Sequence, residues 1–177
     1  MTAVEKIIKF PSPPRRRRDY ETAFLPAALE VVETPPSPTG RAIEQLQTLR
    51  AIGVTGAWVL ATEIFGWRQI KNRRQLGALV GLVPAPYQSG ETQSDQGITR
   101  AGNKHVRRVM VQLAWVWLQY QPDSALSPWY QRRFGGSGRR LRRIGIVALA
   151  RKLLIALWRY LETGVVPDGA QLKPMEG

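Results

Sequence analysis

The sequence predicts an all-α fold, because apolar residues recur at helical spacing through most of the chain after residue 40. In the segments 43–52 and 106–117 apolar side chains fall three or four positions apart and so share one helix face. Glycines and prolines interrupt these patterns between segments, as turns between helices do. With 177 residues the chain is long enough to bury one core, so a single helical domain is expected.

Residues 1–43 are predicted to form a disordered leader ahead of a helical domain over 44–173. The leader contains seven prolines by residue 38, and prolines at that density prevent a packed element. It also contains four consecutive arginines, Arg15 to Arg18. That run is compatible with a nucleic-acid tether, a localisation patch or a solvated tail.

The helical domain is expected to begin with two helices that turn at a glycine. The first runs from Arg41 and ends at Gly53, and the second follows residues 54–56 and continues to Phe65. This arrangement resembles a helix-hairpin-helix, whose turn amides can face a phosphate. Plain packing of a helical hairpin is the alternative interpretation.

In the middle of the chain, the sequence predicts a short helix, then a polar loop and then a largely apolar helix. The short helix covers 73–82, and the loop covers 87–103, where Asn103 is a suitable N-cap for the next helix. That next helix is apolar on most sides, so it lies either at the centre of the domain or against a second subunit. Its residues Trp115 and Trp117 are interpreted as core rather than as surfaces for base stacking.

After residue 120 the sequence predicts a helix break at 121–123, followed by a short aromatic segment and a flexible glycine-rich turn at 135–138. A long basic helix is then expected to run through Leu161. Positive charge opposes the helix macrodipole at an N-terminus, so arginines at the start of this helix suggest a separate role. We interpret that role as phosphate contact, the alternative being a solvated helix start. The arginines are Arg139, Arg140, Arg142 and Arg143.

The charge balance points to a polyanionic partner. Lys and Arg number 26 against 13 Asp and Glu, a net charge of +13, and almost all of the excess lies after residue 40. Charge of this size favours nucleic acid, with an acidic protein or an anionic membrane as alternatives. The absence of cysteine excludes disulfides and thiolate sites, and a single histidine, His105, excludes a multi-histidine metal site. No apolar run reaches the roughly 18 residues of a membrane span, so a cytoplasmic protein without membrane contact is expected.

Three motifs carry a resemblance to a known family. They are LQTLRAIGVTGAWVLATEI at 46–64, RQLGALVGLVPAPYQSG at 74–90 and GITRAGNKHVRR at 97–108. Together they resemble the C-terminal domain of insertion-sequence transposases that join a RuvC-like acidic domain to a serine-bearing domain and use a structured guide RNA. The resemblance implies DNA transposition and recombination, with DNA, a guide RNA and a homo-oligomer or full-length transposase as partners.

The resemblance also implies site residues. It makes Ser89 the nucleophile that attacks a DNA phosphodiester, a role that the residues alone do not indicate, because Ser-Gly is ordinary turn chemistry. Basic residues beside this loop are candidate phosphate ligands: Arg100, Lys104, Arg107 and Arg108. No carboxylate cluster is apparent in the sequence, so no cofactor is expected in this chain, and Mg²⁺ is expected only with the family's acidic domain.

The leader carries a second, shorter resemblance. The stretch FLPAALEVVETPPSPTGRAI at 24–43 is similar to the cytoplasmic leader of a type I secretion membrane-fusion protein. Three hypotheses follow. The chain is a truncated, inactive transposase part that binds DNA, a subunit of a split active transposase, or a non-enzymatic adaptor that carries a secretion-protein leader.

Overall fold

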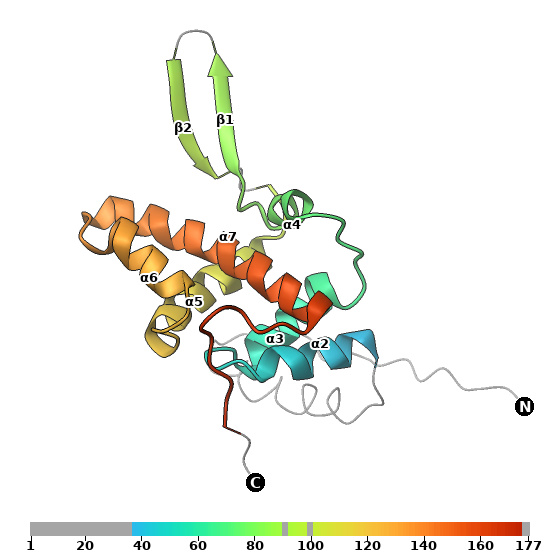
Figure 1. The fold of residues 1–177 in the computed structure, drawn as a ribbon. Helices are drawn as coiled ribbons and strands as arrows, with labels where there is room; N and C mark the ends of the chain where they lie inside the picture. Colours follow the sequence, from blue (N-terminus) through green and yellow to red (C-terminus); the bar gives the residue numbers. More distant parts are fainter. Residues whose placement is uncertain (1–36, 90–91, 99–100, 175–177) are drawn as a thin grey trace, which may run out of the picture.

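Helices form most of the structure, which is a computed structural model that describes residues 37–89, 92–98 and 101–174. A β-hairpin projects from the helical body (Figure 1). In chain order the elements are α2 (Pro38–Gln47), α3 (Val54–Leu60), the π-helical turn η1 (Ala61–Phe65), α4 (Arg73–Val80), β1 (Pro84–Ser89), β2 (Thr92–Ile98), α5 (Lys104–Tyr120), α6 (Leu126–Tyr130), the π-helical turn η2 (Gln131–Gly135) and α7 (Arg139–Thr163).

Side-chain caps fix where several helices begin. Ser37 is the N-cap of α2, and its hydroxyl accepts from the backbone N–H of Gly40 at 3.0 Å. The next residue, Pro38, is the first of the helix, a position at which proline is well tolerated. Asn72 caps α4 and Asn103 caps α5, each accepting from two backbone amides of the first turn. Helices α4 and α7 end at Gly81 and Gly164, whose φ angles of 69° and 72° lie in the left-handed region that glycine adopts without strain.

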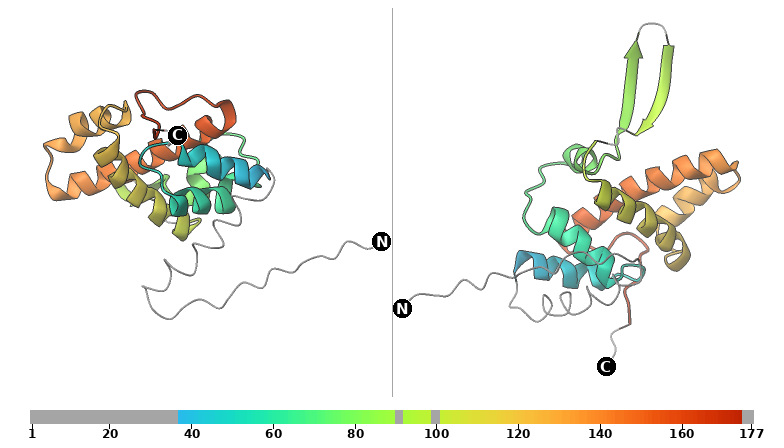
Figure 2. Two further views of the ribbon diagram at one scale, coloured as in Figure 1. Left: turned by 90° about the horizontal axis from the view of Figure 1, so that it is seen from below. Right: turned by 180° about the vertical axis from the view of Figure 1, so that it is seen from behind.

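Helix α7 runs through the centre of the body and contributes the largest share of the core (Figure 2). Its fully buried leucines include Leu149 and Leu153, and they pack in one apolar cluster with α5 and α2. From α5 the cluster takes Trp117 and Met110, both with no exposed area. Burial of such large apolar side chains is the main force that holds the helices together.

The helical fold predicted from the sequence is confirmed, with boundaries close to those expected for α4, α5 and α7. The first helix begins at Pro38, earlier than expected, and ends at Gln47. Leu49 and Ile52 therefore lie in the turn before α3, yet both are buried as their spacing predicted. Helices α2 and α3 lie on either side of the turn that ends at Gly53, and the helix-hairpin-helix interpretation of this pair stays a prediction. Residues 38–43 of the predicted leader belong to α2, so its boundary at residue 43 is wrong. Residues 1–36 lie outside the described residues, and their disorder stays a prediction.

The polar segment predicted as a loop is instead a β-hairpin, so that prediction is wrong. Strands β1 and β2 pair antiparallel, with Ser89 opposite Thr92 and Pro84 opposite Ile98, and the register shifts between Pro84 and Pro86. Proline lacks a backbone donor, which explains an irregular ladder at this end. Figure 2 shows the hairpin standing clear of the helices in the view from behind.

The segment after α7 folds back along the body. Leu172 forms an isolated antiparallel bridge with Leu49, and the Lys173 amide donates to the Thr48 carbonyl at 2.8 Å. The last described residues are thereby held against the turn that joins α2 to α3. Among the described residues, every helix is too short or too polar to cross a membrane.

Candidate nucleic-acid interface

Six exposed arginines lie at the end of the body where η2 meets α7. We call this set the arginine surface: Arg132, Arg133, Arg139, Arg140, Arg142 and Arg143. In the described part of the chain the one ion pair joins His105 and Glu63, so none of these arginines has a carboxylate partner there. Unpaired guanidinium groups gathered on one surface retain their full capacity to bind phosphate oxygens.

Aromatic residues hold the arginine surface in place. The Tyr130 hydroxyl donates to the Arg142 carbonyl at 3.3 Å. The ring of Phe134 lies against Gly145 so closely that a Cβ atom there would overlap it. Phe134 also contacts Trp129 and Tyr130, with ring centroids 5.9 and 5.7 Å apart. The first two turns of α7 are thus fixed to α6 and η2, which presents the arginines in a defined arrangement.

The start of α7 has no acidic residue to compensate its positive charge. Gly138 is the N-cap and offers no side-chain acceptor, and the first turn contains no acidic residue. The helix macrodipole places partial positive charge at this end, where Arg139 and Arg140 add more. A bound anion would relieve this concentration of positive charge, which agrees with the sequence interpretation of the segment.

A groove with a volume of about 630 Å³ lies beside the arginine surface. Trp115 and Gln119 of α5 line it on one side, and Arg139, Arg142 and Arg143 of α7 line it on the other. Trp115 is 49% exposed, so its interpretation as core is wrong, whereas Trp117 is buried as predicted. The sequence did contain a signal, because Trp115 lies off the core face of its helix.

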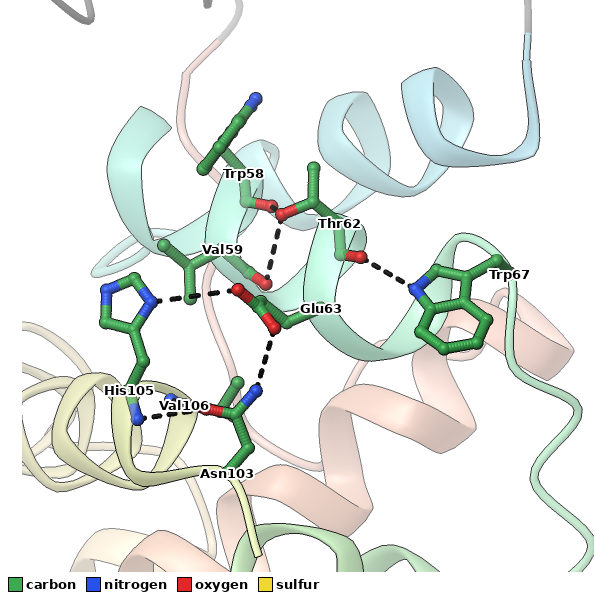
Figure 3. A network of polar contacts seen from close by, with 8 residues as sticks. All are labelled: Trp58, Val59, Thr62, Glu63, Trp67, Asn103, His105 and Val106. Atoms are coloured by element: carbon green, nitrogen blue, oxygen red, sulfur yellow. Dashed lines mark hydrogen bonds and ion pairs between the residues drawn. The ribbon is translucent and has the colours of Figure 1, made fainter. Parts of the chain in front are cut away.

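The start of α5 is organised by a short polar network (Figure 3). Asn103 accepts from the amides of His105 and Val106, and its Nδ2 donates to Glu63 Oε2 at 2.8 Å. The other carboxylate oxygen of Glu63 lies 3.9 Å from His105 Nδ1. The network ties α5 to η1, and it places the exposed Lys104 and Arg108 at the first turns of α5.

Arg107, a predicted phosphate ligand, makes an internal contact. It is half-buried, and its guanidinium donates to the Val80 carbonyl at 3.0 Å. The backbone N–H of Asn103 donates to the carbonyl of Leu79, the residue before Val80, at 2.9 Å. Side chains on Gly81 or Gly102 would overlap the opposing backbone, so both glycines permit this close approach. These contacts fasten the two roots of the hairpin to each other.

The remaining predicted residues lie on or beside the hairpin. Ser89 is the last residue of β1, beside the hairpin turn, and Arg100 lies outside the described residues. Because the second half of α5 borders the groove, Lys104 and the arginine surface lie toward opposite ends of α5, about 20 Å apart along its axis. The structure therefore groups the predicted cations into two separate sets. The described residues include no group of three or more His, Asp or Glu side chains that could hold a metal ion.

Comparison with known proteins identifies a family that this sequence matches. Residues 43–127 match the family model described as "Transposase IS116/IS110/IS902 family". This segment of the chain belongs to that transposase family. The matched segment includes the hairpin and α5, and it ends before the arginine surface begins.

Curated relatives agree with the family. The chain is 48% identical over 129 residues to a protein of Sinorhizobium fredii named "Putative transposase y4rJ", covering 72% of this chain and 32% of that relative. It is 33% identical over 126 residues to the transposase for insertion sequence element IS1328 of Yersinia enterocolitica, covering 70% of this chain and 36% of that relative. The chain thus spans about a third of the length of these transposases.

Proposed function

We propose that this chain is a nucleic-acid-binding helical domain that acts in DNA transposition. The observation that carries the proposal is the arginine surface, six exposed arginines without a carboxylate partner among the described residues. Membership of a transposase family supports DNA as the partner. A guide RNA would present the same phosphate chemistry to this surface.

The arrangement of the cations favours contact with a phosphate backbone rather than reading of base sequence. Lys104 and Arg108 lie at one end of α5 and the arginine surface borders the other, so a bound strand could meet both sets. Contacts to phosphates position a protein on nucleic acid but carry little sequence information. Binding is therefore expected to be strong at low salt and only weakly dependent on sequence.

Ser89 is proposed as the nucleophile, with its oxygen forming the bond to phosphorus while a sugar oxygen of the DNA leaves. Two observations support this role: the family match includes Ser89, and the projecting hairpin carries it away from the helical body (Figure 1). A serine hydroxyl requires activation. The described residues do not fit a metal centre, so any Mg²⁺ would be held by carboxylates elsewhere, such as those of a full-length transposase or another subunit.

The proposal is tested by measuring the affinity of the full chain for a labelled 30-base-pair duplex by fluorescence anisotropy between about 50 and 200 mM salt. Six or more phosphate contacts would weaken binding about 10³-fold over this range. Affinity that does not change with salt would contradict the proposal.

A matched pair of variants separates the arginine surface from net charge. The double variant Arg142→Ala/Arg143→Ala should reduce the slope of log affinity against log salt by about 2, because two phosphate contacts are lost. The variant Arg41→Ala/Arg159→Ala removes the same charge from exposed positions elsewhere and should leave the slope close to that of the wild type. Equal losses in both variants would show that net charge alone drives binding.

A further inference from the structure

We propose that the groove between α5 and the start of α7 binds an unpaired base of single-stranded nucleic acid. Trp115 provides the stacking surface, and Arg139, Arg142 and Arg143 contact the adjoining phosphates. The inference rests on the proposed nucleic-acid function and extends it, because it assigns a subsite for one structural form of the ligand.

The exposure of Trp115 is the first observation. Trp117, two residues later, is fully buried, whereas Trp115 leaves 49% of its surface open beside the groove. The other apolar residues of α5 that line this wall, Val116 and Leu118, are partly buried. A large exposed indole above an apolar wall is suited to a flat, unstacked ring.

Charge complementarity identifies the occupant. The side of the groove opposite Trp115 is formed by three arginines, and no lining residue is acidic. A ligand that fits must therefore be flat and aromatic at one point and anionic next to it, which describes a nucleotide within a strand. The volume of about 630 Å³ falls within the range of about 300 to 1,000 Å³ that is usual for pockets that hold compact ligands.

Rigidity of the groove supports binding without rearrangement. Tyr130 both lines the groove and anchors the Arg142 backbone, and the Phe134 ring against Gly145 fixes the next turn of α7. The backbone that carries the arginines is thus held against α6 and η2. Bases within a duplex are stacked on one another and cannot present a face to the indole, so the groove should discriminate in favour of single strands.

The test compares the full chain with Trp115→Ala and Trp115→Phe in binding labelled 12-nucleotide dT and rU strands and a duplex, by fluorescence anisotropy. Trp115→Ala should bind the single strands at least about tenfold more weakly, and Trp115→Phe should recover most of the loss. Affinity for duplex and the salt slope should stay unchanged, because the indole is uncharged. The dT and rU arms show whether DNA or RNA is the preferred strand.

Trp67→Ala is the matched control. Trp67 is 65% exposed and has the Arg68 guanidinium 4.2 Å from its ring centroid, yet neither residue lines the groove. This variant should bind single strands as the wild type does. Thermal unfolding monitored by circular dichroism checks that every variant is folded.

The outcomes separate the two proposals. A wild-type chain that binds neither duplex nor single strands would overturn the proposed function and this inference together. Wild-type binding that is unaffected by Trp115→Ala would overturn the groove assignment alone. If Trp115→Ala binds single strands normally but has a different sedimentation coefficient from the wild type, the groove accommodates a second copy of the chain. This result also overturns the assignment.

Discussion

Gln121 is a buried polar residue that joins three separate parts of the chain. Its Nε2 donates to the carbonyls of Arg50 and Gln171 at 2.5 and 2.8 Å, and its Oε1 accepts from the Gln171 amide at 2.7 Å. Its exposed area is zero. The side chain therefore provides the hydrogen-bond partners of the Arg50 carbonyl and the Gln171 backbone N–H.

Replacing Gln121 with Leu should lower the free energy of unfolding by about 1 to 3 kcal/mol, since the Arg50 carbonyl and the Gln171 backbone N–H lose their partner, whereas the Gln171 carbonyl still accepts from the Arg50 N–H. Urea denaturation measures the change. Gln112→Leu makes the same replacement at an exposed position of α5 and should change stability by no more than about 0.5 kcal/mol. Similar effects at the two positions would refute the structural role of Gln121.

Gly145 is required by the ring that lies against it. Gly145→Ala should lower the free energy of unfolding by about 1 to 3 kcal/mol, because the added methyl overlaps Phe134 and the gain in helix propensity offsets only part of that strain. Chemical denaturation gives the value. Gly136→Ala has open space around its Cβ position and serves as the control, expected to be near neutral. If Phe134→Leu in the same chain failed to relieve the loss, another source of strain would be implicated.

Individual residues were predictable where one physical rule decides their role. Asn103 was identified as a cap because asparagine before an apolar helix has few other uses, and the buried face of α5 followed from its spacing. Arg107 and Gln121 were not predictable, because their partners Val80 and Arg50 lie far away in the sequence. Long-range hydrogen bonds leave no periodic signal.

At the scale of elements, the root of the hairpin depends on the start of α5. Asn103→Ala removes both the cap and the bond to Glu63 and should cost about 1 to 2 kcal/mol of stability. Asn103→Ser retains a hydroxyl cap and should cost less than half as much. Hydrogen exchange at the amides of His105 and Val106 should accelerate in the alanine variant. Equal losses for serine and alanine would show that the cap contributes little.

The elements also show which patterns reveal structure. Helices α5 and α7 bury long apolar faces, so their existence could be predicted from local sequence. The hairpin could not, because its strands contain Pro84, Pro86 and Gly97 and lack the alternating apolar residues that indicate a half-buried strand. It projects from the body, so the pattern that burial imposes on a sequence is missing.

For the whole molecule, the proposal that Ser89 lies in this chain and the metal-binding carboxylates lie elsewhere predicts that the chain alone does not cleave DNA. The chain alone should neither nick nor join supercoiled DNA with Mg²⁺, because its described residues offer no carboxylate cluster to activate Ser89. Agarose gel electrophoresis of the plasmid provides the measurement. Cleavage by the chain alone, lost in Ser89→Ala, would show that it activates the serine with its own residues.

A complementation experiment tests Ser89 directly. A full-length relative whose matching serine is replaced should regain strand transfer when this chain is added, if the two meet across subunits. Ser89→Ala should abolish the restored activity and leave DNA affinity near normal, since one hydroxyl contributes little to binding. Covalent protein–DNA adducts formed equally by Ser89→Ala would exclude this serine as the nucleophile.

From the return of residues 171–173 to the α2–α3 turn we expect a constraint on how the chain folds during its synthesis. The Lys173 side chain donates to the Ile52 carbonyl across a separation of 121 residues, and Gln171 reaches the adjacent Arg50. Helices α2 and α3 therefore leave the ribosome long before the segment that completes their surroundings. Until that segment arrives, Leu49 and its apolar neighbours lack part of their cover. We therefore expect native packing only after α7 and residues 171–173 have been translated, and nascent chains stalled before α7 should bind chaperones.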